Sequence, residues 1–264
     1  MATNALQFNG LQTDVRTDVT GKPTRNVLLS SIPDDEYRVL RPLLEPVNLP
    51  RYLILNDAGE QIEFVYFLNQ GMTSLVVVTH DGESVEVGVV GREGVVGVSV
   101  IAGVNRGAFR GIMQIPGEGV RISVDQVKEI LPSIPELQRR AHHFVLLQSL
   151  QVGQVAACNR LHEVDQRLAR WLLMCQDRVE SPVLPLTHEF LAQMLGAGRP
   201  TVSLACARLE SAGMIENRRG TLQVIDRKQL ENTACECYHV IKNFNGGLGL
   251  RQVGGTSASS SVRV

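Results

Sequence analysis

The sequence has no cysteine before position 158, and only five in 264 residues: Cys158, Cys175, Cys206, Cys235 and Cys237. Their spacing does not match a disulfide framework, which favours a reducing compartment such as the cytoplasm. Four thiolates cannot be gathered near the N-terminus for an iron–sulfur cluster. No apolar run reaches about 18 residues, so we expect no membrane span, and the start shows no signal peptide.

An excess of charge of either sign is also missing. The formal net charge is −1, and residues 163–245 carry ten basic and ten acidic side chains. Any nucleic-acid surface must therefore be a local patch. Paired carboxylates, a nucleophile elbow and a phosphate loop are not visible, so we do not expect an enzyme. With 44% hydrophobic and 20% charged residues, the chain has enough apolar residues for a globular core.

The clearest pattern lies between residues 186 and 225. Its first half has apolar side chains three and four positions apart, beginning at Leu191, which predicts a helix with one buried face. Thr187 stands at the N-cap position, and Gly196 stands where the helix should end. A second helix should run from Arg199 to about Ala212, with a proline in its first turn. Two helices joined by a glycine turn form a helix-turn-helix.

Two short strands with an arginine-containing turn follow, at residues 214–215 and 222–224. This wing makes the segment a winged helix-turn-helix, whose cations suit DNA phosphates and base edges. The DNA-binding residues that we predict are Thr187, Gln193, Arg199, Pro200, Thr201, Ser203, Arg208, Arg218 and Arg219. The alternative is an ordinary helical hairpin whose charges are only solvated.

Residues 51–124 are rich in strand-forming runs. Four runs are separated by glycine-containing breaks: Tyr52–Leu55, Phe64–Leu68, Ser74–Val78 and Val85–Val90. Short strands at this spacing predict an antiparallel barrel or roll. The Asp81-Gly82 pair predicts a hairpin turn. Before them, residues 26–47 are partly helical in pattern, and residues 1–25 are polar and resemble a loose arm.

A long helix without proline is predicted from Glu136 to Leu161. Its apolar residues occupy more than one face, so more than one side must be covered. One face can lie on the roll and another can pair with its copy in a two-fold homodimer. The alternative is a helix buried within its own subunit. A further helix is expected at residues 164–178.

The last predicted helix starts at Asp226, which can cap it, and ends near Phe244. Cys235 and Cys237 would lie on different faces of this helix and would be poor joint ligands. Three histidines without a motif could ligate haem or a metal: His80, His142 and His143. Lone histidines are weak signals, so we expect neither a metal site nor a cofactor.

Together these patterns predict an α+β chain in five parts. They are a disordered arm (1–25), a β-roll sensor domain (26–134), a long dimerisation helix (135–162), a winged helix-turn-helix DNA-binding domain (163–245) and a disordered tail (246–264). This order, over about residues 26–230, resembles the Crp/Fnr family of bacterial transcription regulators. Besides the helix-turn-helix, the resemblance is carried by the Leu55–Glu60 turn and by the Val65–Phe67 run with Gly71 after it.

The resemblance implies an antiparallel, cyclic-nucleotide-binding-like roll that senses an effector, a dimerising helix and a DNA-reading helix. Arg199 matches the arginine that opens the family's recognition helix. The family commonly has an acidic residue next, where this chain has Pro200, so the usual base preference is not expected. RNA polymerase is a further expected partner.

The sensor site departs further from the family's pattern. Its cyclic-nucleotide binders use a glutamate for the ribose hydroxyl and an arginine for the cyclic phosphate. Here Val98 takes the glutamate's place, and Arg106 matches the arginine at a shortened distance. The expected effector pocket therefore contains Gly97, Val98, Ser99 and Arg106, and we do not expect a response to cyclic AMP.

The sequence thus predicts a cytoplasmic, homodimeric transcription regulator that reads a palindromic operator in double-stranded DNA, without contact to a membrane. A different class stays open: a sensor or scaffold gated by a cyclic nucleotide or haem, whose helix-turn-helix contacts protein. Retention of DNA by the purified protein separates the two.

Overall fold

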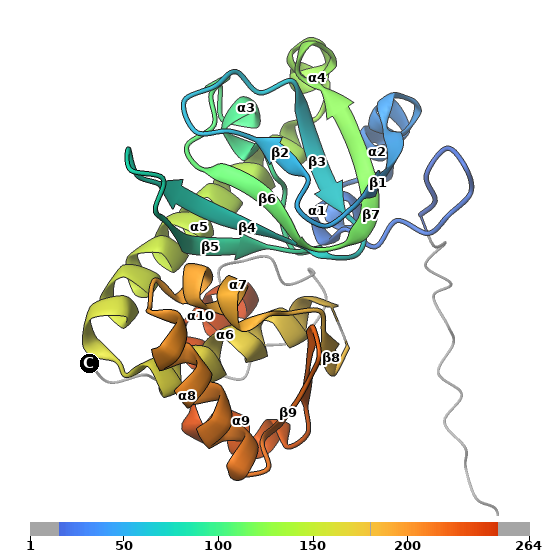
Figure 1. Cartoon of the computed structure of the whole chain (residues 1–264). Coiled ribbons are helices and arrows are strands. Elements are labelled where there is room, and N and C mark those ends of the chain that lie inside the picture. The colour runs from blue at the N-terminus through green and yellow to red at the C-terminus, as the bar shows by residue number, and fades with distance from the viewer. Residues whose placement is uncertain (1–15, 180, 248–264) are drawn as a thin grey trace, which may run out of the picture.

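The computed structural model describes residues 16–179 and 181–247, with a β-rich upper part and a helical lower part (Figure 1). A long helix, α5 (Pro135–Leu161), runs behind the β-rich part and reaches the helical part. This arrangement confirms the predicted α+β fold. Within the two described ranges, no helix is both long and apolar enough to cross a bilayer. The predicted arm and tail lie outside these ranges at residues 1–15 and 248–264.

Seven strands form the roll: β1 (Glu45–Leu49), β2 (Ile54–Asn56), β3 (Phe64–Leu68), β4 (Met72–Val78), β5 (Ser84–Val90), β6 (Arg110–Ile115) and β7 (Gly117–Ser123). They pair antiparallel in two sheets, with the orders β1-β7-β3 and β2-β6-β4-β5. The predicted hairpin joins β4 to β5, and Gly82 has the expected positive φ of 86°. This turn is therefore confirmed.

Three of these strands, β1, β6 and β7, are not among the runs predicted from the sequence. In β7, a Cβ on Gly117 would lie 2.1 Å from the carbonyl oxygen of Gln70, and one on Gly119 would lie 2.3 Å from that of Phe67. Glycine permits this close approach of neighbouring backbones. The same glycines interrupt the alternation that marks a strand in sequence.

Four short helices accompany the strands of the roll: α1 (Val27–Ser31), α2 (Asp34–Leu40), α3 (Val98–Ile101) and α4 (Val124–Ile130), with 3-10 turns at Arg41–Leu43 and Leu131–Ser133. The described end of the predicted arm, residues 16–25, is held against them. Arg16 donates to the carbonyl oxygen of Leu29 at 2.6 Å, and Arg41 Nε donates to that of Thr17 at 2.7 Å. Ordered contacts therefore begin inside the segment predicted to be a loose arm.

The long helix α5 buries one face and leaves another open. The buried side chains are Leu137, Ala141, Phe144, Leu147, Gln151, Val155 and Cys158. This face lies against β5, α3 and, near its end, α10 (Cys237–Gly247). On the other side, Leu146 is 54% exposed. An apolar side chain of this size in solvent agrees with the expectation that a second side of the helix needs a cover.

The lower part consists of α6 (Val164–Val179), β8 (Val183–Leu184), α7 (His188–Leu195), α8 (Arg199–Ser211), β9 (Ile215–Arg218), β10 (Thr221–Val224), α9 (Arg227–Thr233) and α10. Asp226 caps α9 as predicted, by accepting from the backbone nitrogen of Gln229 at 2.9 Å. The single last helix predicted from Asp226 to Phe244 is wrong. The chain leaves the helix after Thr233 and starts a new one at Cys237.

The two parts share a buried junction between β5 and α6. Glu86 of β5 is buried, and its carboxylate accepts from the indole nitrogen of Trp171 at 2.7 Å and from Ser74 Oγ at 2.5 Å. Beside it, Arg178 donates to Glu93 at 2.7 Å. Because a buried carboxylate is poorly solvated, burial raises the pKa of Glu86 to about 7. The lower part is thus held against the roll by a polar cluster.

Candidate nucleic-acid interface

The predicted helix-turn-helix is formed by α7 and α8. Thr187 Oγ1 accepts from the backbone nitrogen of Phe190 at 3.3 Å, and Gly196 ends α7 with a left-handed φ of 55°. The predicted cap and turn are therefore confirmed. In α8 the buried stripe consists of Val202, Ala205, Cys206 and Leu209. This stripe fixes which side of α8 faces solvent.

The solvent side of α8 is a continuous face about four turns long. We call it the reading face, and it consists of Arg199, Pro200, Thr201, Leu204, Ala207, Arg208 and Ser211. Leu204 is 53% exposed, and sequence reasoning missed it. Its spacing from Pro200 and Arg208, four residues each way, was the available signal. Leu204 and Ala207 are apolar and suit the methyl group of thymine.

Two arginines at the edges of the reading face hold exposed ion pairs. Arg199 Nε lies 3.5 Å from Glu189 Oε2, and Arg208 lies 3.0 Å from Asp165 Oδ2. Exposed pairs of this kind contribute about 0–1 kcal/mol to stability. A phosphate or a guanine edge can therefore replace the carboxylate at little cost.

Three predicted contact residues make other interactions. Ser203 Oγ lies 3.0 Å from His188 Nδ1, and the hydroxyl of Thr187 is used as the cap. Gln193 donates to Ser84 Oγ in the roll. The second ring nitrogen of His188 lies 3.4 Å from Asn217 Oδ1 in the wing. His188 thus links α7, α8 and the wing, a role that its sequence position did not reveal.

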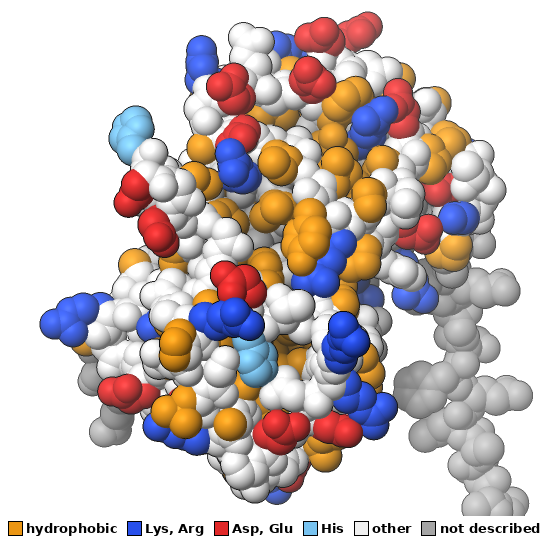
Figure 2. All heavy atoms as spheres, viewed as in Figure 1, with side chains coloured by type: hydrophobic (Ala, Val, Ile, Leu, Met, Phe, Trp, Pro, Cys, Tyr) orange, Lys and Arg blue, Asp and Glu red, His pale blue; other side chains and the backbone are white. Residues whose placement is uncertain are grey.

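The wing is the hairpin of β9 and β10, with register Thr221 opposite Arg218. Arg218 Nε lies 3.1 Å from Glu216, and Arg219 is exposed at the turn. On the face drawn in Figure 2, basic and acidic side chains are interleaved over the lower part of the molecule. A nucleic-acid surface on this part of the molecule would therefore depend on a few placed cations, as the balanced charge of residues 163–245 predicts.

The predicted effector pocket is small, and most of its lining is apolar. A cavity of about 50 Å³ lies beside Gly97, Val98 and Ser99, and its wall includes Ile62 and Phe109. Val98 is only 8% exposed. The fourth predicted residue, Arg106, is exposed and donates to the carbonyl oxygen of Gly59 at 2.6 Å. The structure therefore brings three of the four residues to one cavity and turns Arg106 to the surface.

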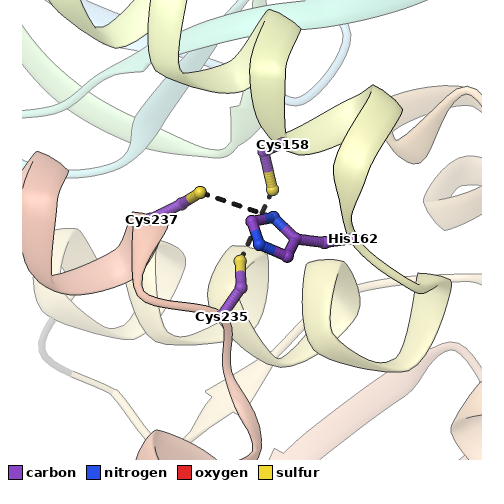
Figure 3. A group of neighbouring side chains, drawn as sticks. All are labelled: Cys158, His162, Cys235 and Cys237. Atoms are coloured by element: carbon purple, nitrogen blue, oxygen red, sulfur yellow. Dashed lines mark hydrogen bonds between the residues drawn. The ribbon is translucent and has the colours of Figure 1, made fainter.

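A group of cysteines and a histidine lies where the long helix ends (Figure 3). Cys158, His162, Cys235 and Cys237 each point one potential ligand atom inward, and these atoms lie within 4.8 Å of one another. The expectation that Cys235 and Cys237 sit on different faces of one helix is wrong. Cys235 lies in the three-residue segment between α9 and α10, and only Cys237 is helical.

Two thiols of this cluster, those of Cys158 and Cys235, form a hydrogen bond. Cys158 Sγ lies 3.5 Å from Cys235 Sγ. The hydrogen bond from Cys235 lowers the pKa of Cys158 to about 5, and the same contact raises the pKa of Cys235. A thiolate is thus favoured at Cys158 while Cys235 keeps its proton. Thiolates are the form in which cysteine binds metals.

Comparison with known proteins agrees with this architecture. Residues 166–233 match the model of the Crp-like helix-turn-helix domain. No curated protein matches the sequence. Among solved structures, FixK2 from Bradyrhizobium japonicum is 14% identical with a TM-score of 0.62, covering 73% of this chain and 98% of its own.

Two further structures have similar scores. CLP of Xanthomonas campestris, described as a c-di-GMP-responsive global regulator, is 15% identical with a TM-score of 0.60, covering 72% of this chain and 98% of its own. A CRP-family transcriptional regulator from Thermus thermophilus, TTHB099, is 19% identical with a TM-score of 0.58, covering 71% of this chain and 96% of its own. The chain therefore contains a Crp-like helix-turn-helix domain and has the fold of the Crp/Fnr regulators.

Proposed function

We propose that this protein is a sequence-specific DNA-binding transcription regulator of the Crp/Fnr type. The observation that carries the proposal is the reading face of α8, which stands free on a domain that matches the Crp-like helix-turn-helix. A recognition helix needs an exposed face with donors at its N-terminal end, and Arg199 supplies them. The wing arginines and Arg208 are suited to phosphates.

We further propose a homodimer that pairs through the open side of α5. Small or apolar exposed residues recur along this side: Val145, Leu146, Ser149, Gly153, Ala156 and Ala157. Small side chains let two helices approach closely, and Leu146 gains a cover. A two-fold pair presents two copies of α8 to two half-sites, which is why such operators are near-palindromes. RNA polymerase is the expected partner of the bound dimer.

The signal would act at the link between α5 and α6. α5 ends at Leu161, and His162 that follows is extended, with φ −116° and ψ 149°. α7 rests on the hairpin at Ser84, and a cavity of about 590 Å³ separates this hairpin from the start of α8. A shift between two arrangements of this link, biased by the roll, would change the presentation of α8.

The replacement Arg199→Ala is expected to weaken specific DNA binding by about 1–3 kcal/mol and to relax one position in each half-site. The matched control is Arg38→Ala, which replaces an exposed arginine on α2 of the roll and should bind DNA as the parent does. An Arg199→Ala protein with the parent's sequence preference would show that Arg199 does not contact a base.

Replacing Arg218 and Arg219 together should instead weaken binding to all DNA sequences. The slope of the logarithm of affinity against the logarithm of salt concentration should become shallower by about 0.9 for each lost phosphate contact.

Cyclic AMP is not expected to bind this protein at micromolar concentration. The cavity of about 50 Å³ is far below the roughly 300 Å³ or more typical of ligand pockets. Val98 cannot accept a bond from the ribose hydroxyl, and an unpaired polar group costs about 1–3 kcal/mol. Titration calorimetry with cyclic AMP, cyclic GMP and cyclic di-GMP, repeated on Val98→Glu, measures this. Micromolar binding by the parent protein that tightens its DNA binding would overturn the expectation.

A further inference from the structure

Four metal-ligand side chains converge from two distant parts of the chain (Figure 3). Cys158 and His162 lie four residues apart at the end of α5, and such positions share one face of a helix. Cys235 lies between α9 and α10 and Cys237 is the first residue of α10, more than seventy residues later in the chain. Their three sulfur atoms and one ring nitrogen lie within 4.8 Å of one another. Nothing in the proposed DNA-binding role requires this convergence.

We propose that Cys158, His162, Cys235 and Cys237 form a tetrahedral site for one zinc ion. Three thiolates and one imidazole are a ligand set of structural zinc sites, with Zn–S about 2.3 Å and Zn–N about 2.0–2.1 Å. Tetrahedral angles then place neighbouring ligand atoms about 3.5–3.8 Å apart. Cys158 Sγ lies 3.5 Å from Cys235 Sγ, and Cys237 Sγ lies 3.6 Å from His162 Nδ1. Both separations match a site around a single ion.

The surroundings of the cluster orient its ligands. His162 Nδ1 faces the sulfur atoms, and its other nitrogen, Nε2, lies 3.2 Å from Glu236 Oε1. A carboxylate on the far nitrogen of a metal-binding histidine fixes the ring and raises its basicity. Gln154 Nε2 donates to Cys237 Sγ at 3.0 Å, a hydrogen bond that suits a bound thiolate. The cluster thus has second partners for two of its four ligands.

The charge around the cluster also fits a loaded site. Zn²⁺ with three thiolates and a neutral imidazole carries one net negative charge. Two buried arginines of α6, Arg167 and Arg170, lie close enough to Cys158 to act on it electrostatically. The Nε atom of each is buried without a hydrogen-bond partner among the described residues. A buried cation is costly unless it is compensated, and the anionic metal complex supplies the compensation.

Two other uses of the cysteines fit less well. An iron–sulfur cluster places several iron and sulfide atoms between its thiolates, and ligand atoms within 4.8 Å of one another leave room for one ion. A Cys158–Cys235 disulfide would join only two of the four residues. A disulfide would not account for the contact between Glu236 and His162. The mononuclear site uses all four.

A zinc ion here would cross-link the end of the long helix α5 to the start of α10 in the lower part of the molecule. His162 is the C-cap of α5, and the two later cysteines lie where α10 begins to lie along α5. With the metal bound, the end of α5, the link and the last helix move as one unit. Metal binding displaces thiol protons and stabilises the folded form that contains the site.

The test is the metal content of the full-length protein, purified under reducing conditions without oxygen. We expect about one zinc ion per chain by inductively coupled plasma mass spectrometry. We also expect the unfolding temperature to rise when zinc is added to metal-stripped protein. Cobalt(II) added to stripped protein should give sulfur-to-cobalt charge-transfer absorption with the intensity of a tetrahedral site. Iron with sulfide at the site, or a reduced protein that binds neither zinc nor cobalt, would overturn the proposal.

Matched variants distinguish loss of the zinc ligands from loss of folding. Cys237→Ala should lose stoichiometric zinc, whereas Cys206→Ala, at a buried cysteine of α8 outside the cluster, should keep it. His162→Cys should retain zinc because a thiolate replaces the imidazole, and His162→Ala should not. Glu236→Gln should weaken zinc binding about 10- to 100-fold. Equal zinc in Cys237→Ala and Cys206→Ala would contradict the assignment, and so would full affinity in His162→Ala.

Discussion

A protein that carries both Leu146→Glu and Gly153→Glu is expected to be a monomer and to lose at least a hundredfold in affinity for a two-half-site operator. Leu146 is 54% exposed, and a Cβ built on Gly153 meets no described atom within 4 Å. Neither glutamate therefore disturbs the subunit itself. In a pair through this side of α5, the new carboxylates would be buried against their copies, which is costly without partners. A monomer can contact only one half-site, so it loses the gain in affinity that comes from two linked recognition helices.

Light scattering and DNA titration measure the two effects. The parent should have about twice the chain mass of 29.0 kDa, and the double variant should have the chain mass. Val104→Glu, at an exposed valine of the roll, is the control and should stay dimeric. A double variant that keeps the dimer mass would show that the subunits pair elsewhere.

The replacement Glu86→Gln is expected to change how stability depends on pH. In the folded protein burial raises the pKa of Glu86 from 4.5 to about 7. A raised carboxyl pKa means that the folded state favours the protonated form. The contribution of Glu86 protonation to the free energy of unfolding is therefore full below about pH 4.5 and is lost as pH rises through about 7. At about 1.4 kcal/mol per pKa unit, the parent should lose roughly 3 kcal/mol relative to the variant across this range.

Urea unfolding of both proteins at several pH values between about 4.5 and 8 tests this prediction. Glutamine keeps an oxygen that accepts from Trp171 and does not titrate. Burial raises the pKa of the neighbouring Cys175 well above its usual range, so this thiol does not add a second titration between these pH values. Unfolding free energies that run parallel with pH would show that Glu86 is not the titrating group at this junction.

Local signals in the sequence were sufficient to predict much of the helix-turn-helix domain. The ends of α7 are set by Thr187 and Gly196, and the start of α9 by Asp226, because a cap depends only on residues within one turn. The β4–β5 turn follows in the same way from Gly82. The Crp-like character of the domain could also be predicted, because the helices, the glycine turn and the wing occur in a fixed order.

Features set by tertiary packing could not be predicted. The break between Thr233 and Cys237 contains neither glycine nor proline, so no local signal ends the helix there. Without that break, Cys235 and Cys237 could not be expected to face Cys158. In the roll, β7 could not be predicted because its glycines interrupt the alternating pattern of a strand. These glycines are needed only because a neighbouring backbone lies close to them, which the sequence does not show. The partners of Ser203 and Gln193 come from elements that the sequence does not place next to them.

The most direct test of the proposed function is selection of DNA from a random library by the purified full-length protein, followed by titration of the enriched sequence. We predict an inverted repeat with half-sites about one helical turn apart, and a specific affinity at least about a thousandfold above that for unrelated DNA. Arg199→Ala should lose the preference at one position of each half-site. DNA retained without any enriched sequence, or no DNA retained, would contradict the account and favour a helix-turn-helix that contacts protein.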